Sequence, residues 1–297
     1  MKSTITALAS ILALTSNAAP TKRATTPITD GDILNYALTL EHLEDTFYRE
    51  ALAKYTLADF IAANFTEETY MRIQTIASDE KTHVSFLTSA LTAAGAKPVA
   101  ECTYDFGYKD VAGFMATASV LEGVGVSAYL GAAADIMSKT YLTAAGSILT
   151  VEARHSSYIR NSIKESPFPS PFDNPLGLNE VYTLAAPFIK SCPESNVALP
   201  VKAFPMLAAS AVNGEEIKAG GMVMVSTKDY KIEGEVYAAF ITVTGPVWAE
   251  VMMKDGGYEV TIPEGIAGQS YLVFTSCKDS ATDDTIVAGP ALVEVSA

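Results

Sequence analysis

Two helix-patterned segments of this chain each carry a glutamate followed three residues later by a histidine. The pairs are Glu80-x-x-His83 and Glu152-x-x-His155. Residues three apart lie on one face of an α-helix, so the carboxylate and the imidazole of each pair point to the same side. The chain has 3 histidines, and two of them occupy these positions. Two such pairs, with one glutamate from each of two further helices, form the ligand set of a dinuclear iron or manganese site in a helical bundle.

A second spacing supplies the two further glutamates. Glu41 is followed seven residues later by Tyr48, and Glu122 is followed seven residues later by Tyr129. Seven residues make two helical turns, which places each tyrosine on the same face as its glutamate. The first half of the chain is therefore a twofold repeat, in which a Glu-x6-Tyr helix precedes a Glu-x-x-His helix. We expect the two tyrosines to hydrogen-bond the carboxylates that bind metal.

The residue types explain the predicted chemistry. Four carboxylates in a core of low dielectric constant would repel one another and take up protons. Two divalent cations neutralise the four charges, and two neutral imidazoles complete the coordination. Carboxylate oxygen with imidazole nitrogen suits iron and manganese better than an ion that prefers thiolates. The predicted cofactor is two Fe or Mn ions, and the predicted ligands are Glu41, Glu80, His83, Glu122, Glu152 and His155.

Other polar residues on the same segments are expected to have different roles. Glu44 also falls on the inner side of the first helix and is an alternative to Glu41, although the tyrosine spacing favours Glu41. His42 follows Glu41 directly, so it points elsewhere and is expected at the surface or at the edge of the core. Asp45 and Asp79 are expected at the surface or behind the ligands. Arg154 and Arg160 are expected in surface ion pairs.

Four long helix patterns position these residues, and the links between them predict the topology. The patterns cover residues 30–55, 66–94, 110–137 and 141–165, with expected N-caps at Thr66 and Asp110 and an expected stop at Gly95. Short links favour antiparallel neighbours within each half, whereas residues 96–109 are enough to span a helix length. One long crossover is typical of a ferritin-like four-helix bundle. A proline-rich loop at 167–175 then precedes an extra helix over 178–190.

The composition changes after Pro193 to short runs rich in Val, Tyr, Phe and Thr, separated by Gly, Asp and Pro. The expected strands are 221–226, 236–243, 258–262, 270–277 and 285–295. Five or more short strands in about 100 residues predict a β-sandwich of immunoglobulin-like type. This part holds no histidine and no catalytic constellation. The predicted organisation is a leader over 1–23, a helical bundle over 24–193 and a β-sandwich over 194–297.

The leader is expected to be a signal peptide with a short pro-segment. Lys2 supplies a positive charge, residues 5–14 an apolar stretch, and residues 16–18 a small-residue cleavage site. Lys22-Arg23 resembles a dibasic processing site. The apolar stretch is too short to cross a bilayer, and no transmembrane segment is expected in the mature chain. The predicted location is secreted and extracellular, with association to a cell wall as a variant, and Asn64 begins an N-glycosylation acceptor.

Charge limits the possible partners, and the cysteine content predicts a disulfide. The net charge of -14 would repel phosphates, so nucleic acid is excluded as a partner. Three cysteines in a secreted protein imply one disulfide and one thiol. Cys102 and Cys192 lie outside the regular elements of the helical half, and we pair them, although the sequence leaves the other two pairings open. Cys277 lies in an apolar strand pattern and is expected to be a buried thiol.

Three stretches resemble the secreted fungal ferritin-like domain proteins, whose members have been described as stress-response, desiccation-related or late-sexual-development proteins. They are residues 38–49, 121–131 and 151–155, and the likeness extends over about 26–193. Residues 199–205 and the β-rich tail are also similar to these fungal members. The resemblance implies a ferritin-like fold, with the same six residues as metal ligands.

Two classes of function follow from the sequence. The first is a di-iron or di-manganese oxidoreductase acting on O2, peroxide or Fe(II), as an oxidase, a ferroxidase or a catalase-like enzyme. The second is a non-catalytic secreted or wall-associated stress or development protein, whose bundle is structural and whose β-domain binds a wall or protein partner. An iron-storage cage is disfavoured, because its shell would have to accommodate the appended β-domain.

Overall fold

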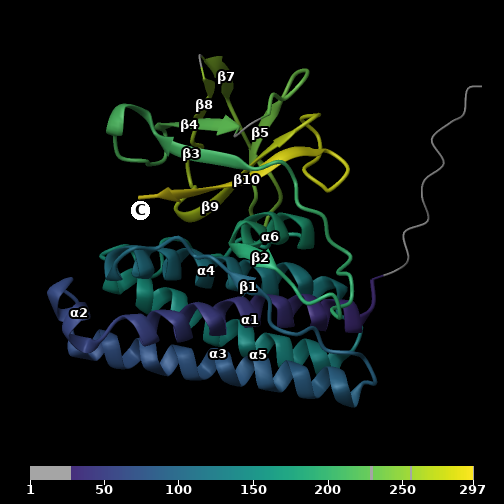
Figure 1. The fold of residues 1–297 in the computed structure, drawn as a ribbon. Helices are drawn as coiled ribbons and strands as arrows, with labels where there is room; N and C mark the ends of the chain where they lie inside the picture. The colour runs from purple at the N-terminus through teal and green to yellow at the C-terminus, as the bar shows by residue number, and fades with distance from the viewer. Residues whose placement is uncertain (1–27, 228–229, 255, 297) are drawn as a thin grey trace, which may run out of the picture.

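In the computed structural model, long helices run side by side beneath a β-domain (Figure 1). The structure describes residues 28–227, 230–254 and 256–296, so the expected leader over 1–23 lies outside the described residues. The long helices of the bundle are α1 (Asp30–Lys54), α3 (Glu67–Ala93), α4 (Val111–Ala132) and α5 (Lys139–Ser162). These helices carry all six predicted ligands.

Local signals in the sequence fix where the helices begin and end. Thr66 accepts a hydrogen bond from the backbone N–H of Thr69 at 3.0 Å, and Asp110 accepts one from Gly113 at 2.8 Å. Each bond satisfies an N–H group that the first helical turn leaves free. Gly95 has a φ of 73° just beyond the end of α3, a conformation that glycine adopts without steric cost. The predicted caps and the predicted stop are confirmed.

The bundle consists of two helix pairs joined by one long crossover. α1 packs on α3 and α4 packs on α5, and a short helix, α2 (Leu57–Ala62), lies in the link within the first pair. α6 (Leu178–Ala185) contacts both α4 and the β-domain (Figure 1). The prediction that this helix reaches Lys190 is wrong. Pro187 cannot continue an α-helix, and the chain passes through a 3-10 turn into a short strand.

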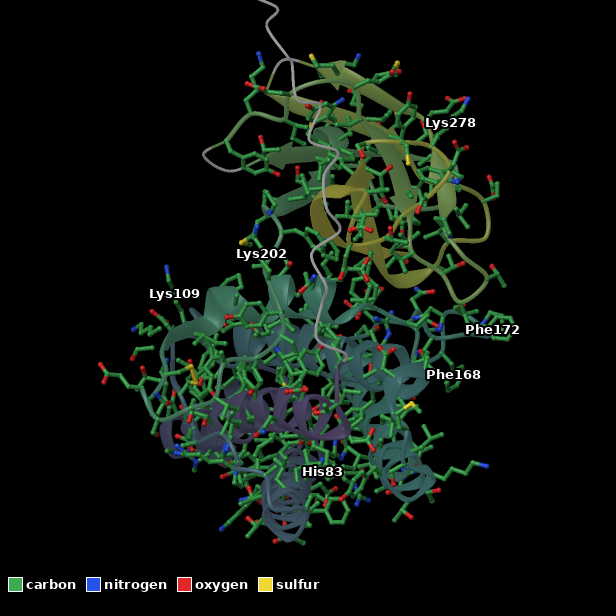
Figure 2. The ribbon with its side chains drawn as sticks, turned by 90° about the vertical axis from the view of Figure 1, so that its right-hand side faces the viewer. His83, Lys109, Phe168, Phe172, Lys202 and Lys278 are labelled. Carbon is green, nitrogen blue, oxygen red and sulfur yellow. A yellow bond between two sulfur atoms is a disulfide. The ribbon has the colours of Figure 1, made fainter. Side chains whose placement is uncertain are left out.

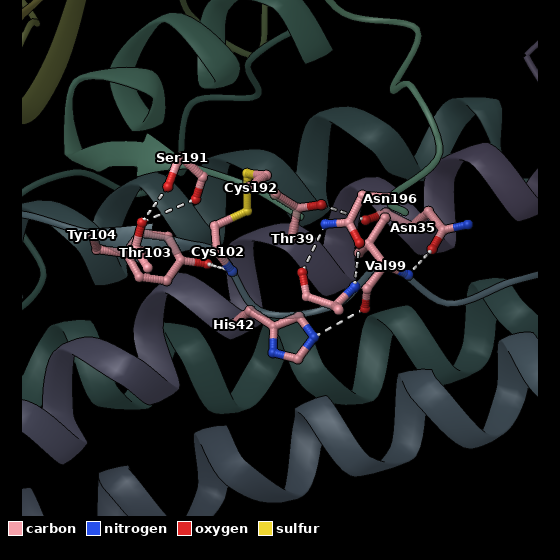
Figure 3. The surroundings of a disulfide bond; sticks show 11 residues. Asn35, Thr39, His42, Val99, Cys102, Thr103, Tyr104, Ser191, Cys192 and Asn196 are labelled. Carbon is pink, nitrogen blue, oxygen red and sulfur yellow. Dashed lines mark hydrogen bonds between the residues drawn. A yellow bond between two sulfur atoms is a disulfide. The ribbon is translucent and has the colours of Figure 1, made fainter. Parts of the chain in front are cut away.

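The crossover is tied to the end of the helical domain by a disulfide (Figure 3). Cys102 and Cys192 are bonded, which confirms the predicted pairing. Beside them β1 (Thr103–Tyr104) pairs with β2 (Ile189–Ser191). Asn35 of α1 accepts a hydrogen bond from the N–H of Val99 at 2.9 Å, and the Nε2 atom of His42 lies 3.2 Å from the Val99 carbonyl oxygen. His42 therefore lies at the core edge and stabilises the crossover.

The described part of the β-domain forms two four-stranded antiparallel sheets, with the orders β3-β4-β8-β7 and β10-β9-β5-β6. Lettered A to G in chain order, with β6 as C′, these are the A-B-E-D and G-F-C-C′ sheets of an immunoglobulin-like sandwich. The predicted fold class is confirmed. The strands are β3 (Leu207–Ala211), β4 (Met222–Thr227), β5 (Tyr237–Phe240), β6 (Val247–Ala249), β7 (Val251–Lys254), β8 (Gly257–Thr261), β9 (Gly268–Thr275) and β10 (Ile286–Val295).

The sequence did not predict three of the strands at the sheet edges, β3, β6 and β7, and the environment predicted for one thiol was wrong. β3 is rich in alanine, and β6 and β7 are edge strands of three and four residues, so none shows the β-branched pattern of a longer strand. β9 ends at Thr275, so Cys277 lies in a bend and is a half-exposed free thiol within the described ranges. The expectation that Cys277 is buried is wrong.

α4 lies against the β-domain and the proline-rich loop, and glycines permit the close approach. A Cβ atom on Gly123 would lie 2.5 Å from the side-chain oxygen of Gln269, and one on Gly131 would overlap the carbonyl oxygen of Leu176. Glycine inside a helix costs about 1 kcal/mol relative to alanine. That cost is offset here by the contacts that a flat helix surface permits.

The substitution Gly131→Ala is expected to destabilise the protein by about 2–4 kcal/mol, because the added methyl group must displace the backbone at Leu176. Gly146→Ala on α5 is the matched control, since no atom lies within 4 Å of a Cβ built there. The control is expected to stabilise the protein by up to about 1 kcal/mol. Urea unfolding measures both changes. Equal stabilities for the two variants would contradict the close contact between α4 and the loop.

Arg160 joins the two domains, contrary to its expected place in a surface ion pair. The side chain is buried on α5, and its Nη2 atom lies 2.6 Å from Oε1 of Glu294 on β10. Nη1 donates to the other oxygen of Glu294 at 3.0 Å, which makes the pair bidentate. Tyr271 of β9 adds a second link, since its hydroxyl donates to the carbonyl oxygen of Gly123 at 3.0 Å. The relative position of the domains is thus held by directed polar contacts.

Among the described residues, Val111–Asp135 is a helical stretch long and apolar enough to cross a membrane by length and composition. Within the molecule 67% of its apolar window is buried. This is the burial expected of a central bundle helix that packs on α1, α5 and α6.

Candidate metal centre

Side chains from all four long helices meet in the middle of the bundle. α1 contributes Glu41, α4 contributes Glu122, and α3 and α5 each contribute one Glu-x-x-His pair. Two overlapping groups of four have ligand atoms that all lie within 4.8 Å of one another. The groups are Glu41, Glu80, His83 and Glu152, and Glu80, Glu122, Glu152 and His155. Glu80 and Glu152 belong to both groups, the position that a carboxylate bridging two metal ions would occupy.

The first group is centred on His83, which lies inside the bundle on the side away from the β-domain (Figure 2). Its Nδ1 atom lies 3.2 Å from Glu41, 3.2 Å from Glu80 and 3.1 Å from Glu152. One imidazole nitrogen therefore faces three carboxylates from three different helices. Such a convergence is unfavourable for the acids unless a cation or a proton lies between them.

The second group is centred on His155. Its Nδ1 atom lies 3.0 Å from Glu80 and 3.4 Å from Glu122, while its Nε2 atom lies 3.2 Å from Oδ2 of Asp79. A carboxylate that accepts the Nε2 proton leaves Nδ1 with a free lone pair, as a metal ligand requires. Asp79 is half-exposed and thus lies behind the site, one of the two places expected for it.

The two tyrosines cross between the halves of the repeat. The hydroxyl of Tyr48 on α1 donates to Glu122 on α4, and the hydroxyl of Tyr129 on α4 donates to Glu41 on α1. Burial and the adjacent carboxylates raise the pKa of both tyrosines well above the usual value, so both keep their protons. Each tyrosine therefore orients the glutamate of the other half of the repeat. Helical spacing alone had placed each tyrosine on the same face as the glutamate of its own helix.

The four glutamates of the two ligand groups are fully buried, and several of their oxygens lack a hydrogen-bond partner among the described residues. The unsatisfied atoms are Oε2 of Glu41, Oε1 of Glu80, Oε2 of Glu122, both oxygens of Glu152 and Nδ1 of His155. Buried polar atoms are normally paired, and unpaired ones are costly. All these atoms are electron-pair donors, so the donor set fits a pair of cations.

Without metal, the cluster would hold protons in their place. Burial raises the pKa of Glu41 to about 7. Burial also acts to raise the pKa of Glu80, but the adjacent imidazoles of His155 and His83 outweigh it and hold that pKa at about 2. Burial acts to lower the pKa of each histidine, yet the surrounding glutamate carboxylates dominate and raise it to about 12 for His83 and about 11 for His155. Metal binding must therefore displace protons from this site.

Glu44 lies beside the cluster but belongs to neither ligand group of the described residues. Its carboxylate is buried, and burial together with the charges of Glu152 and Glu80 raises its pKa well above the usual range. A Cβ atom on Gly125 would lie 3.0 Å from Glu44 and 3.5 Å from Glu152. Gly125 is a site residue that the sequence analysis missed. Its signal was a glycine in the middle of a helix, one turn after Glu122.

A cavity of about 440 Å³ connects the cluster with solvent between α3 and α5. Both histidines line it, together with Thr75, Asp79, Arg154 and Tyr158. A smaller cavity of about 110 Å³ lies on the opposite side, where Glu44 and Gly125 meet apolar residues of α6 and its flank. The histidine side of the centre is thus the one that a water-borne molecule reaches.

Comparison with known proteins agrees with this geometry. Residues 29–165 match the family described as "Ferritin-like domain". Over 195 residues the chain is 27% identical to "Protein rds1" of Schizosaccharomyces pombe, an alignment that covers 65% of this chain and 47% of that protein. The chain thus spans about half the length of this curated relative.

A solved structure of a conserved hypothetical protein, rv2844, from Mycobacterium tuberculosis is 17% identical and covers 48% of this chain and 96% of that one, with a TM-score of 0.37. That likeness is too weak to bear on fold or chemistry. The family match, the crossover topology and the buried Glu-His cluster lead to one conclusion. Residues 29–165 of this chain form a ferritin-like domain, which is followed by an antiparallel β-domain.

Proposed function

We propose that this protein is a secreted oxidoreductase with a dinuclear Fe or Mn centre, acting on O2, peroxide or Fe(II). The observation that supports it is the pair of overlapping ligand groups, whose buried oxygens lack hydrogen-bond partners among the described residues. A purely structural core would be expected to pair such atoms with donors. The family match over residues 29–165 supports the same conclusion.

The ligands of the two ions would be the six clustered residues. Glu80 and Glu152 belong to both ligand groups, Glu41 and His83 to the first, and Glu122 and His155 to the second, so these residues would hold the ions. Bound Fe or Mn would supply the electron transfer to or from the substrate. Glu44 belongs to neither ligand group, and burial together with the charges of Glu152 and Glu80 raises its pKa, so it can hold a proton beside the centre.

Several residues would position the ligands rather than bind metal. Tyr48 and Tyr129 each fix one carboxylate through a hydroxyl that stays protonated. Asp79 fixes the ring of His155. The open cavity beside the histidines gives a small polar molecule such as peroxide a direct path, which supports a substrate that arrives from water.

The disulfide and the loop before α3 support secretion. The Cys102–Cys192 bond is the kind of link that persists in oxidising compartments. Asn64 is exposed in the loop between α2 and α3, where its side chain is accessible to N-linked glycosylation.

Metal analysis of the natively purified protein, followed by assays of peroxide disproportionation and Fe(II) oxidation, tests the proposal. We expect about two Fe or Mn ions per chain and turnover that is lost on chelation and restored by reloading. Less than one ion per chain would contradict the metal centre. Full occupancy without turnover in either assay would favour the second class of function, in which the metal serves only the fold.

A further inference from the structure

A cleft of about 690 Å³ lies at the junction of the two domains, and none of the six clustered ligand residues lines it. One wall is α5 with its neighbour α4, another is the proline-rich loop over residues 166–176, and the third is the start of β9. Ligand sites in multidomain proteins favour such junctions, and a few hundred Å³ is their usual size. The size of the cleft fits two or three linked sugar rings better than a single ion.

The walls of the cleft are fixed before any ligand arrives. Arg160 donates from Nε to the carbonyl oxygen of Ser166 at 2.8 Å, which anchors the start of the loop. The N–H of Leu176 donates to the Ser127 carbonyl oxygen at 3.1 Å and anchors its end. In the middle, Pro169 packs so closely on the backbone of Gly268 that a Cβ atom there would overlap the ring. A preformed site binds without the cost of ordering its walls.

The loop presents two phenyl rings to solvent at the level of the junction (Figure 2). The side chain of Phe168 is 79% exposed and that of Phe172 is 63% exposed. Four prolines within residues 167–175 restrict the backbone that carries them. Rings held in water on a stiff loop are typical of a recognition surface, because their exposure has no folding benefit. Flat apolar rings are suited to stack on the C–H faces of sugar rings.

The polar groups of the cleft are balanced in charge. Arg154 and Asp173 form no ion pair within the described residues, and their charges are opposite, while the charge of Arg160 is compensated by Glu294. The remaining polar groups are uncharged hydroxyls and amides, among them those of Ser156, Ser157, Asn161, Asn174 and Gln269. Planar amide, carboxylate and guanidinium groups pair with two adjacent hydroxyls at once. A polyanion would find no net positive charge here.

From these observations we propose that the interdomain cleft binds a neutral carbohydrate chain. The phenyl rings of Phe168 and Phe172 stack on sugar faces at its mouth, and the hydroxyl and amide groups bind sugar hydroxyls inside. Arg154 and Tyr158 line both this cleft and the cavity that reaches the histidines, so a bound chain lies next to the entrance of the metal centre. The binding itself does not depend on metal.

Isothermal titration of the full chain with soluble oligosaccharides tests the proposal. The probes are β-1,3- and β-1,4-linked gluco-oligosaccharides, chito-oligosaccharides and, as an anionic comparison, oligogalacturonate. We expect at least one neutral probe to bind, and the double variant Phe168→Ala with Phe172→Ala to bind it about tenfold more weakly. Phe86→Ala is the control, because Phe86 is 46% exposed on α3 and does not line the cleft. It is expected to bind like the native chain.

Three outcomes would overturn the proposal: no neutral probe binds at millimolar concentration, oligogalacturonate binds more tightly, or the double variant binds as well as the native chain. The metal content of all variants should equal that of the native chain. Sugar binding by a protein that holds no metal would support this proposal and contradict the proposed oxidoreductase. A metal-loaded, active protein that binds no sugar would contradict this proposal alone.

Discussion

Replacement of Glu80 by alanine is expected to empty both halves of the metal centre. Glu80 belongs to both ligand groups, and its two oxygens lie 3.2 Å from Nδ1 of His83 and 3.0 Å from Nδ1 of His155. Loss of a shared ligand should lower the metal content from about two ions per chain to near zero. Any peroxide or Fe(II) turnover should fall by at least about 100-fold.

Glu41→Ala and Glu67→Ala are the matched comparisons. Glu41 belongs to one ligand group, so its replacement should leave about one ion per chain. Glu67 lies on the same helix as Glu80 but is exposed, and its replacement should change nothing. Elemental analysis of the three dialysed variants measures the number of metal ions per chain, which should be lowest in Glu80→Ala and highest in Glu67→Ala. If Glu80→Ala retained as much metal as Glu67→Ala, the cluster would not be the binding site.

The chelated protein is expected to become less stable as the pH rises from about 5 to about 8, by at least about 3 kcal/mol. The pKa of Glu41 is raised by burial from 4.5 to about 7, so its contribution is complete below the lower value and is lost as the pH passes the higher one. Burial acts to lower the pKa values of His83 and His155, but the adjacent glutamate carboxylates outweigh it and raise them from 6.5 to about 12 and about 11. Their contribution is complete below 6.5 and declines above it.

Glu80 does not oppose this trend in the same range. Burial acts to raise its pKa, but the histidines hold it at about 2, so its contribution is present above 4.5 and is lost only in stronger acid. Metal-loaded protein should behave in the opposite way, because each ion replaces protons and binds more tightly as the pH rises. The difference in stability between loaded and chelated protein should therefore widen from about pH 5 to about pH 8.

Urea unfolding of loaded and chelated protein at both pH values measures the effect. The variant Glu41→Gln cannot ionise at that position, so its chelated form should show a smaller loss between the two pH values. A chelated protein that is more stable at the higher pH would show that the buried acids are not protonated in the folded state. In that case the cluster would need another counter-charge.

The features that the sequence determined are local or periodic. Glutamate and histidine three residues apart share a helix face in any packing, so Glu80, His83, Glu152 and His155 could be assigned to one site from spacing alone. Caps such as Thr66 and Asp110 depend on a few neighbouring residues. Cys102 and Cys192 lie outside the regular elements of one domain, which favoured their pairing although the sequence left the other two pairings open, and the structure confirms it. In each case the information lies within a few turns of one helix or in the composition of a segment.

Tertiary structure alone decided which side chains meet across elements. The crossing of Tyr48 to Glu122 and of Tyr129 to Glu41, and the room that Gly125 leaves beside Glu44, depend on the rotation and the relative shift of neighbouring helices. Arg160 was expected in a surface ion pair, whereas the structure buries it against β10, where it pairs with Glu294. Helix rotation and domain docking are set by packing over the whole interface, to which each residue contributes little. No short stretch of sequence contains the whole of that packing. The residues of the Glu-His cluster could therefore be predicted from the sequence, and the contacts between them could not.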